Sequence, residues 1–191
     1  MLFDSRCIAI WRGRGLYLQK VAAAFLLGCL TLPASPLHAQ ANQTPPATIR
    51  VVVDDQPPIT LDRPALASMQ RTSVDTAATH HEPSAHWQGV ALEDVLQHAG
   101  APGGEQLRGH GMTTIVRVTA SDHYQVIFSL GELDPMLGNE QVILADTQDG
   151  HPLGKDGPFR LIVPGDKRPA RWIRNVTTIE VTSTTTHSPS R

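Results

Sequence analysis

After about residue 47 the chain alternates between short apolar or β-branched runs and clusters of Gly, Pro, Asp and Asn. Runs of this length and composition predict β-strands bounded by turns. The predicted strands are 48–53, a brief one at 59–61, 72–77, 114–120, 125–129, 141–147, 159–163 and 172–181. The turn residues at 121–123 predict that the strands on either side of them pair antiparallel.

Short helices are expected between these strands. Asp62 is placed to cap the first, which runs to about Met69 and has Pro64 in its first turn. A second has a single apolar face, and Gly100 ends it. That face consists of Val90, Leu92, Val95 and Leu96. The third is 130–137, whereas the His-rich segment 79–88 is expected to be a loop. Strands with a few short helices predict an α+β domain.

The first 41 residues have the features of a secretory signal peptide. Four cations, Arg6, Arg12, Arg14 and Lys20, precede an apolar stretch, Val21 to Leu32, that is too short to span a bilayer comfortably. An A-x-A cleavage site at 39–41 predicts a periplasmic or secreted mature chain beginning at residue 42. Residues 26–29 also resemble a lipobox in which Cys29 would carry a lipid, but the second apolar run at 30–37 favours the soluble exported form.

The mature chain is expected to comprise a polar linker at 42–47, one domain at 48–181 and a disordered Ser/Thr-rich tail at 182–191. The leader contains four of the 16 Lys and Arg residues and one of the 18 Asp and Glu residues. The remaining 12 cations and 17 carboxylates give a formal charge of −5, which argues against a nucleic-acid partner. Both cysteines, Cys7 and Cys29, belong to the leader, so the mature chain has no thiolate metal ligand or Cys nucleophile.

A basic loop near the C-terminus is the strongest candidate for a site. Pro164 and Pro169 stiffen it, and it can present Lys167, Arg168 and Arg171 to one anionic group. Arg offers a planar fork of donors suited to phosphate, and Lys adds a point charge. The alternative is a solvated basic loop that balances the acidic surface elsewhere.

Other chemistry is less well supported. Residues His80, His81, Glu82 and His86 offer metal-binding donors. Their spacing does not match the helical H-E-x-x-H pair, and Pro83 argues against a helix, so no metal ligand is assigned. The sequence has no nucleophile elbow, P-loop or dinucleotide fingerprint, so the catalytic residues stay unknown. The aromatic residues Trp87, Tyr124, Phe128, Phe159 and Trp172 are expected in the core or in a pocket wall.

From about Thr48 to Val181 the chain resembles the molybdopterin-binding domain of sulfite-oxidase-like oxidoreductases. The motifs that carry the resemblance are 87–96 (WQGVALEDVL), 99–101 (AGA), 122–124 (DHY), 129–133 (SLGEL), 149–153 (DGHPL), 157–165 (GPFRLIVPG) and 171–173 (RWI). Their order and spacing together are specific. The resemblance implies an α+β fold with mixed β-sheets and short helices.

The cofactor of that family is molybdenum bound to a pterin dithiolene that bears a phosphate. The resemblance implies that the segment after the Pro-Gly turn contacts this molybdopterin. Arg168 and Arg171 match the family's basic positions ahead of Trp172, with Lys167 as a neighbour. The implied partners are therefore a small anionic cofactor or ligand and a redox or membrane partner protein.

One departure from the family concerns the metal. Catalytic members bind molybdenum through a Cys thiolate placed near residues 74–77, where this chain offers only the oxygens of Asp75 and Thr76. Sulfite oxidation itself is therefore not expected. Two hypotheses stay open: a molybdopterin-dependent oxidoreductase or redox accessory, and a non-catalytic ligand-binding or interaction module that kept the fold and lost the cofactor.

Overall fold

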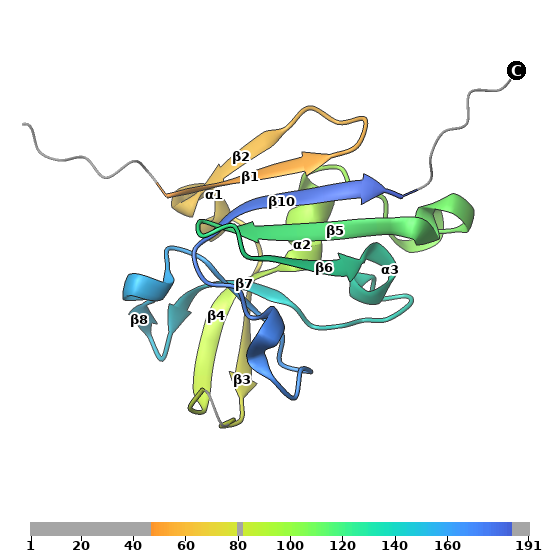
Figure 1. The fold of residues 1–191 in the computed structure, drawn as a ribbon. Helices are drawn as coiled ribbons and strands as arrows, with labels where there is room; N and C mark the ends of the chain where they lie inside the picture. Colours follow the sequence, from red (N-terminus) through yellow and green to blue (C-terminus); the bar gives the residue numbers. More distant parts are fainter. Residues whose placement is uncertain (1–46, 80–81, 185–191) are drawn as a thin grey trace, which may run out of the picture. The chain divides into compact units, whose positions relative to one another are not determined.

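The computed structural model describes residues 47–79 and 82–184, so the predicted signal peptide and most of the predicted linker lie outside the described residues. Two five-stranded sheets form the domain (Figure 1). Sheet A has the strand order β2-β1-β10-β5-β6, and sheet B has the order β3-β4-β7-β8 with β9 paired to β7. The parallel pairing of β1 with β10, among otherwise antiparallel pairs, makes sheet A mixed.

The strands of sheet A are β1 (Thr48–Val53), β2 (Ile59–Asp62), β5 (Thr114–Ala120), β6 (Gln125–Ser129) and β10 (Val176–Ser183). Those of sheet B are β3 (Arg71–Thr76), β4 (Ala85–Ala91), β7 (Ile143–Gln148), β8 (His151–Pro152) and β9 (Arg160–Ile162). In β5 every second residue is buried, as expected of a strand with one face on the core. The β5–β6 antiparallel hairpin is confirmed.

Short helices connect the strands. They are α1 (Arg63–Ala67), α2 (Leu92–His98) and α3 (Leu130–Leu133), with single 3-10 turns η1 (Gly104–Gln106), η2 (Gly109–Thr113), η3 (Gly154–Asp156) and η4 (Pro169–Arg171). The Asp62 side chain accepts a hydrogen bond from the Ala65 amide and so caps α1 as predicted. Gly100 follows α2 with a φ of 89°, the left-handed conformation that ends helices. Of the helices in the described ranges, none combines the length and the apolar character that a membrane span requires.

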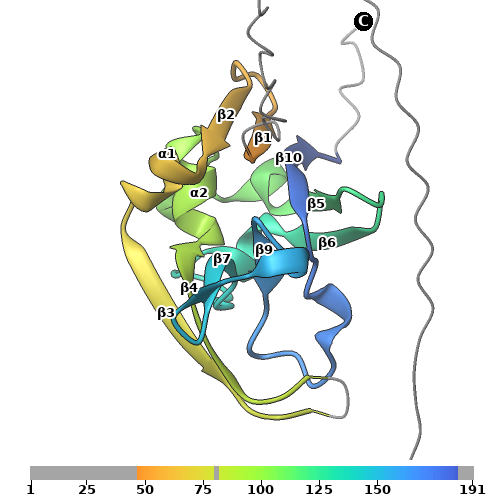
Figure 2. The ribbon, with the colours of Figure 1, turned by 90° about the vertical axis from the view of Figure 1, so that its left-hand side faces the viewer.

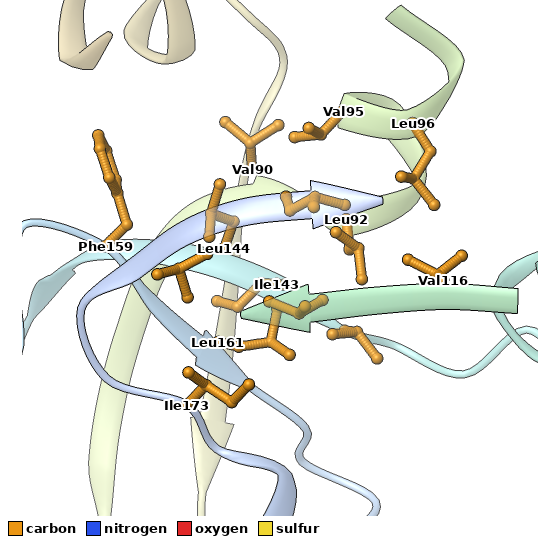
Figure 3. Packing of buried hydrophobic residues seen from close by; sticks show 14 of the residues in the cluster. Val90, Leu92, Val95, Leu96, Val116, Ile143, Leu144, Phe159, Leu161 and Ile173 are labelled. Atoms are coloured by element: carbon orange, nitrogen blue, oxygen red, sulfur yellow. The ribbon is translucent and has the colours of Figure 1, made fainter. Parts of the chain in front are cut away.

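The core lies where side chains of both sheets meet α2. Val116 of β5, Ile143 of β7 and Leu161 of β9 belong to the same buried cluster as Leu92 and Leu96 of α2 (Figure 3), and all of them are at most 2 % exposed. Figure 2 shows α1 and α2 on the same side of the domain. These contacts confirm the predicted α+β fold.

The boundaries of several elements differ from the predictions. Strand β4 begins at Ala85, inside the predicted loop, and Val90 belongs to this strand rather than to the helix. Helix α3 ends at Leu133 because Pro135 disfavours the helical conformation of the residue before it.

The last strand also differs from its prediction. It begins at Val176 instead of 172, after Asn175 adopts a left-handed φ of 51°, and it runs to Ser183, past the predicted end of the domain.

Candidate functional site

A cleft of about 580 Å³ lies beside η4 and is also lined by the β5–β6 turn, η3 and the segment 172–175. Its volume is in the range of small-molecule sites. Six charged side chains line it: the cations Lys155, Arg160 and Arg174, and the acids Glu82, Asp122 and Asp156. The charges are therefore balanced, and they are concentrated on a few short segments.

Arg160 is the most unusual member of this group. It is the first residue of β9, between Phe159 and Leu161, and its side chain is only 2 % exposed. Its guanidinium carbon lies 5.0 Å from the ring centre of Trp87 and 6.0 Å from that of Trp172. Stacking on aromatic faces of this kind partly offsets the cost of burying a cation.

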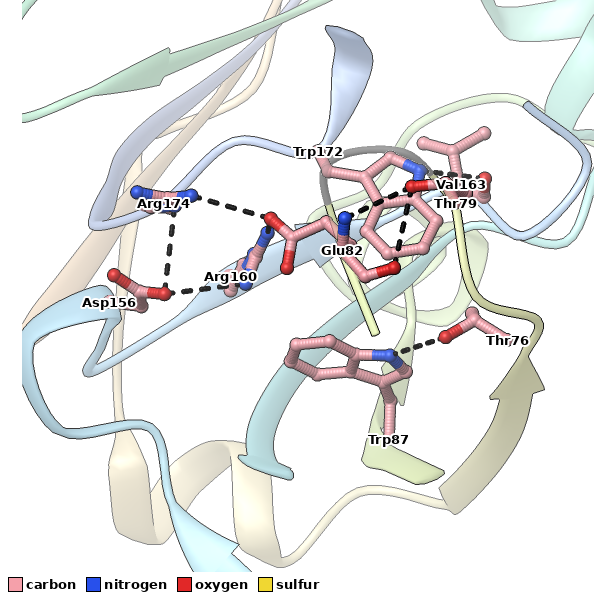
Figure 4. A network of polar contacts seen from close by, with 9 residues as sticks. All are labelled: Thr76, Thr79, Glu82, Trp87, Asp156, Arg160, Val163, Trp172 and Arg174. Carbon is pink, nitrogen blue, oxygen red and sulfur yellow. Dashed lines mark hydrogen bonds and ion pairs between the residues drawn. The ribbon is translucent and has the colours of Figure 1, made fainter. Parts of the chain in front are cut away.

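Two carboxylates hold the Arg160 guanidinium (Figure 4). Its Nη2 donates to Glu82 Oε1 at 2.6 Å, and its Nη1 donates to Asp156 Oδ2 at 3.4 Å. Its Nε has no hydrogen-bond partner among the described residues. A buried N–H without an acceptor is costly, so this atom is an unused donor in the network that lines the cleft.

Arg174 contacts the same two acids from the solvent side. Its Nη2 lies 3.3 Å from Glu82 Oε1, and its Nε lies 3.6 Å from Asp156 Oδ2. The Arg174 side chain is 54 % exposed, whereas that of Glu82 is 13 % exposed. The result is a compact group of two guanidiniums and two carboxylates at the edge of the cleft.

The tryptophans next to this group belong to the core, as predicted. The Trp87 and Trp172 rings meet edge to face, with centres 6.2 Å apart. Trp87 Nε1 donates to Thr76 Oγ1 and Trp172 Nε1 donates to the Val163 carbonyl, so both polar edges are satisfied. Tyr124 lies in the wall of the cleft rather than in the core: it is 51 % exposed, and its hydroxyl donates to the Ala170 carbonyl at 2.9 Å.

The three residues proposed from sequence lie on the neighbouring loop. Lys167 and Arg168 are exposed and line no part of the 580 Å³ cleft. Arg171, in η4, is half-buried and bound to carboxylates: Nε and Nη2 donate to Asp166 at 2.9 and 2.6 Å, and Nη1 donates to Glu132 at 2.8 Å. The structure therefore does not bring the three cations onto one group, and their role in cofactor binding stays a prediction.

The hydrogen bond to Asp166 and, in addition, the one to Glu132 raise the pKa of Arg171 above its ordinary range, although partial burial acts in the opposite direction. The guanidinium also lies 4.7 Å from the centre of the Phe128 ring of β6. Arg171 thus connects the basic loop to α3 and sheet A.

Sequence reasoning missed Arg160, Arg174 and Lys155 as site residues. The available signal was Arg160 itself, because a charged residue between Phe159 and Leu161 in an apolar strand must be paired when it is buried. Arg174 is 14 residues further along the chain, and its proximity to Arg160 follows from the turn after η4, which no sequence pattern predicts.

The position where the family's thiolate is expected holds Thr76 and Asp75. The Thr76 hydroxyl is buried, accepts from Trp87 Nε1 at 3.0 Å and donates to the Ala85 carbonyl at 3.3 Å. Asp75 is 84 % exposed and pairs with His86 Nδ1 at 2.7 Å. Neither residue supplies a soft ligand for molybdenum.

The His-rich segment shows no metal site within the described residues. His80 and His81 lie outside them, Glu82 is bound to the two arginines, and His86 is bound to Asp75. No group of three or more His, Cys, Asp or Glu side chains in residues 47–79 and 82–184 is arranged to hold a metal ion.

The fold and this site agree with one family of redox proteins. The family model described as "Oxidoreductase molybdopterin binding domain" matches residues 49–190, and the chain belongs to that family. The match confirms the resemblance inferred from the sequence motifs.

Among solved structures, the chain is similar to the sulfane dehydrogenase SoxCD from Paracoccus pantotrophus, with a TM-score of 0.55 and 16 % sequence identity. The similarity covers 72 % of this chain and 39 % of that one, so this protein spans about two fifths of the SoxCD chain. At this identity the likeness establishes the sulfite-oxidase-like fold alone. No curated protein matches the chain in sequence.

The residues of the site fit the family's cofactor in part. The volume of the cleft and the cations Lys155, Arg160 and Arg174 suit an organic anion with a ring system. The described residues offer no thiolate ligand for molybdenum, because they contain no cysteine. The hydroxyl of Thr76 is already hydrogen-bonded to Ala85 and Trp87.

Proposed function

We propose that this protein binds an anionic pterin of the molybdopterin type in the cleft beside η4, and that it acts as a redox accessory or cofactor-binding domain. The observation that carries the proposal is the buried Arg160 guanidinium, stacked near two indoles and possessing an unused Nε donor, at the edge of a cleft of about 580 Å³. A buried cation is costly unless it is paired, and both partners of Arg160, Glu82 and Asp156, also line the cleft.

The chain's own residues have separate roles in this proposal. Arg160 and Arg174 provide guanidinium forks for the acidic group of the ligand, and Lys155 provides a third positive charge. Tyr124 closes one wall of the cleft through its hydrogen bond to Ala170. Lys167 and Arg168, exposed on the adjoining loop, attract anions toward the cleft by long-range electrostatics.

When bound, a molybdenum-containing cofactor would supply redox chemistry. The described residues offer it no thiolate, so turnover of the sulfite-oxidase kind is not part of the proposal.

The test is the cofactor content of the full chain, exported by a host that makes molybdopterin. We expect pterin fluorescence after denaturation at about one equivalent per chain. Arg174→Gln should lower this content, because it removes a cation at the cleft. Arg117→Gln is the matched control: Arg117 also forms a partly exposed ion pair, with Glu180 on sheet A, and it does not line the cleft. Preparations without pterin, even after reconstitution, would contradict the proposal.

The second candidate is a binding or interaction module without cofactor. It is favoured by a specific observation: Arg160, Arg171 and Arg174 are all already paired with carboxylates of the chain itself. Pterin-free protein that folds normally would favour this candidate.

We further propose that the protein is exported to the periplasm or secreted, through the leader at 1–41, and that its partner is a redox or membrane protein. N-terminal sequencing of the exported protein tests the first point. A mature terminus at Asn42 is expected, whereas a chain that begins with an acylated Cys29 would show the lipoprotein route.

A further inference from the structure

One oxygen of Glu82 is shared by two guanidiniums. Glu82 Oε1 accepts from Arg160 Nη2 at 2.6 Å and from Arg174 Nη2 at 3.3 Å (Figure 4). These two arginines come from β9 and from the segment before β10, so the Glu82 carboxylate bridges cations that are distant in sequence. An anion held between two guanidinium forks has the geometry of a bound ligand.

Arg160 and Glu82 differ in how firmly their side chains are placed. Arg160 belongs to a buried strand and is enclosed by Trp87 and Trp172. Glu82 precedes β4 in a turn that is closed by hydrogen bonds with Thr79, from the Glu82 amide to Thr79 Oγ1 and from the Thr79 amide to the Glu82 carbonyl. A Glu side chain on such a turn has several rotamers, whereas the guanidinium of Arg160 has little room to move.

Asp156 is the weaker competitor for the same cations. Its Oδ2 lies 3.4 Å from Arg160 Nη1 and 3.6 Å from Arg174 Nε. Its backbone is fixed in η3, where its carbonyl accepts from the Asn175 amide at 3.2 Å. The short contacts of Glu82 therefore make it the main internal anion of the site.

We propose that the Glu82 carboxylate occupies the anion position formed by Arg160 and Arg174, and that an external oxoanion binds by displacing it. This inference rests on the proposed function, in which the cleft takes an anionic ligand, and adds that the chain itself competes for the position. An external anion therefore has to interact with Arg160 and Arg174 more strongly than the Glu82 carboxylate does.

The competition also selects the kind of anion. A monocarboxylate that replaces Glu82 gains no charge, because it exchanges one carboxylate for another. A dianionic phosphate or phosphate monoester brings more charge and additional acceptor oxygens, which Lys155 at the same cleft can use. Phosphate-type anions are therefore preferred over carboxylates.

The experiment is a titration of the full chain with inorganic phosphate, and separately with acetate, at constant ionic strength because salt screens such contacts. Glu82→Gln keeps the shape and the Oε1 acceptor but removes the charge, so phosphate affinity should rise by about tenfold or more. Asp122→Asn is the matched control. Asp122 pairs with no guanidinium among residues 47–79 and 82–184. Its replacement removes one charge from the same cleft and keeps the acceptor for the Tyr124 amide, so the gain should stay below about threefold.

Several outcomes would overturn the inference. Equal gains in the two variants would show that only the net charge of the cleft matters, and no gain in Glu82→Gln would show that the acid does not compete. A gain that persists in Glu82→Gln/Arg174→Gln would place the anion elsewhere, and equal affinity of wild type for acetate and phosphate would contradict the selection of dianions.

The same titration also serves as a control for the folding of the Glu82→Gln variant. If Glu82→Gln is destabilised, phosphate should raise its melting temperature more than that of wild type, since a ligand stabilises the state that binds it. Should it not purify at all, Glu82→Asp, which withdraws the carboxylate by one methylene, should still bind phosphate more tightly than wild type. The experiment distinguishes failure of this inference from failure of the proposed function. A pterin-free protein with the expected Glu82→Gln gain would refute pterin binding alone. A pterin-containing protein without that gain would refute only the competition by Glu82.

Discussion

Replacing Arg171 by Gln tests whether this residue stabilises the fold or binds the cofactor. The change removes a fork that donates twice to Asp166 and once to Glu132, and a cation 4.7 Å from the Phe128 ring centre. Glu132 would keep its other role, in which Oε2 accepts from the Ser129 amide in the capping box of α3. The expected loss therefore comes from the clamp between the basic loop and α3.

The size of the expected loss in stability follows from how exposed the paired side chains are. Exposed ion pairs contribute at most about 1 kcal/mol, and breaking a fully buried pair costs about 3–5 kcal/mol. The side chains of Arg171, Asp166 and Glu132 are 29 %, 18 % and 36 % exposed, which places this group between the two limits. We expect Arg171→Gln to lower the free energy of unfolding by about 2 kcal/mol. The melting temperature should fall by about 6–10 °C.

Thermal and urea denaturation measure this loss, and Arg168→Gln is the matched control. Arg168 is an exposed cation of the same loop and forms no ion pair within the described residues, so its replacement should change stability by less than about 0.5 kcal/mol. Unchanged stability of Arg171→Gln together with loss of pterin would refute the clamp and restore Arg171 as a cofactor contact. A similar destabilisation in both variants would show that the loop does not depend on the ion pairs.

Two further predictions concern sheet B. Burial raises the pKa of Asp146, but the hydrogen bonds from Arg71 and Thr147 outweigh it and leave the pKa below its ordinary value. Because the folded pKa is lowered, the stabilisation by Asp146 is present above about pH 4 and is lost as the pH falls through the folded pKa. Urea unfolding of Asp146→Asn should show a loss of about 2 kcal/mol at pH 7 that shrinks below about pH 4, and a loss independent of pH would contradict the assignment. In Gly89→Ala the added Cβ would overlap the Leu144 carbonyl and lie 2.7 Å from Ala145 Cα, so thermal unfolding should report a loss of about 3 kcal/mol or a failure to fold. A wild-type melting temperature would mean that β4 and β7 are not packed so closely.

Most of the fold could be predicted because each strand has a local pattern. The limits of β5 and β6 agree with the alternation of buried and exposed residues along 114–129. The start of β4 was missed because His86 and Gln88 lie on its outer face and mask the buried Ala85 and Trp87 between them. Hydrophobic periodicity does not identify a short strand when one face of it is polar and the residues on the other face differ in size.

The site was less predictable because it depends on contacts between distant segments. Lys167, Arg168 and Arg171 are close in sequence, yet η4 turns Arg171 toward Asp166 and Glu132. Arg160 and Arg174, by contrast, meet through acids of two other segments, Glu82 and Asp156. Clustered charge in a sequence thus predicts an electropositive loop, but the partners of each cation are decided by tertiary structure.

The balance of charge around the cleft links the family to what this chain can do. The chain belongs to the molybdopterin-binding family, and residues 42–191 have a formal charge of −5, so the cations at the cleft must act locally to attract an anion. Each guanidinium at the cleft is already paired with an acid, so the ligand binding that we propose is an exchange of anions. The anion contacts that we propose lie on other segments than Asp75 and Thr76, where the family's thiolate is expected, so an anion site does not depend on that thiolate.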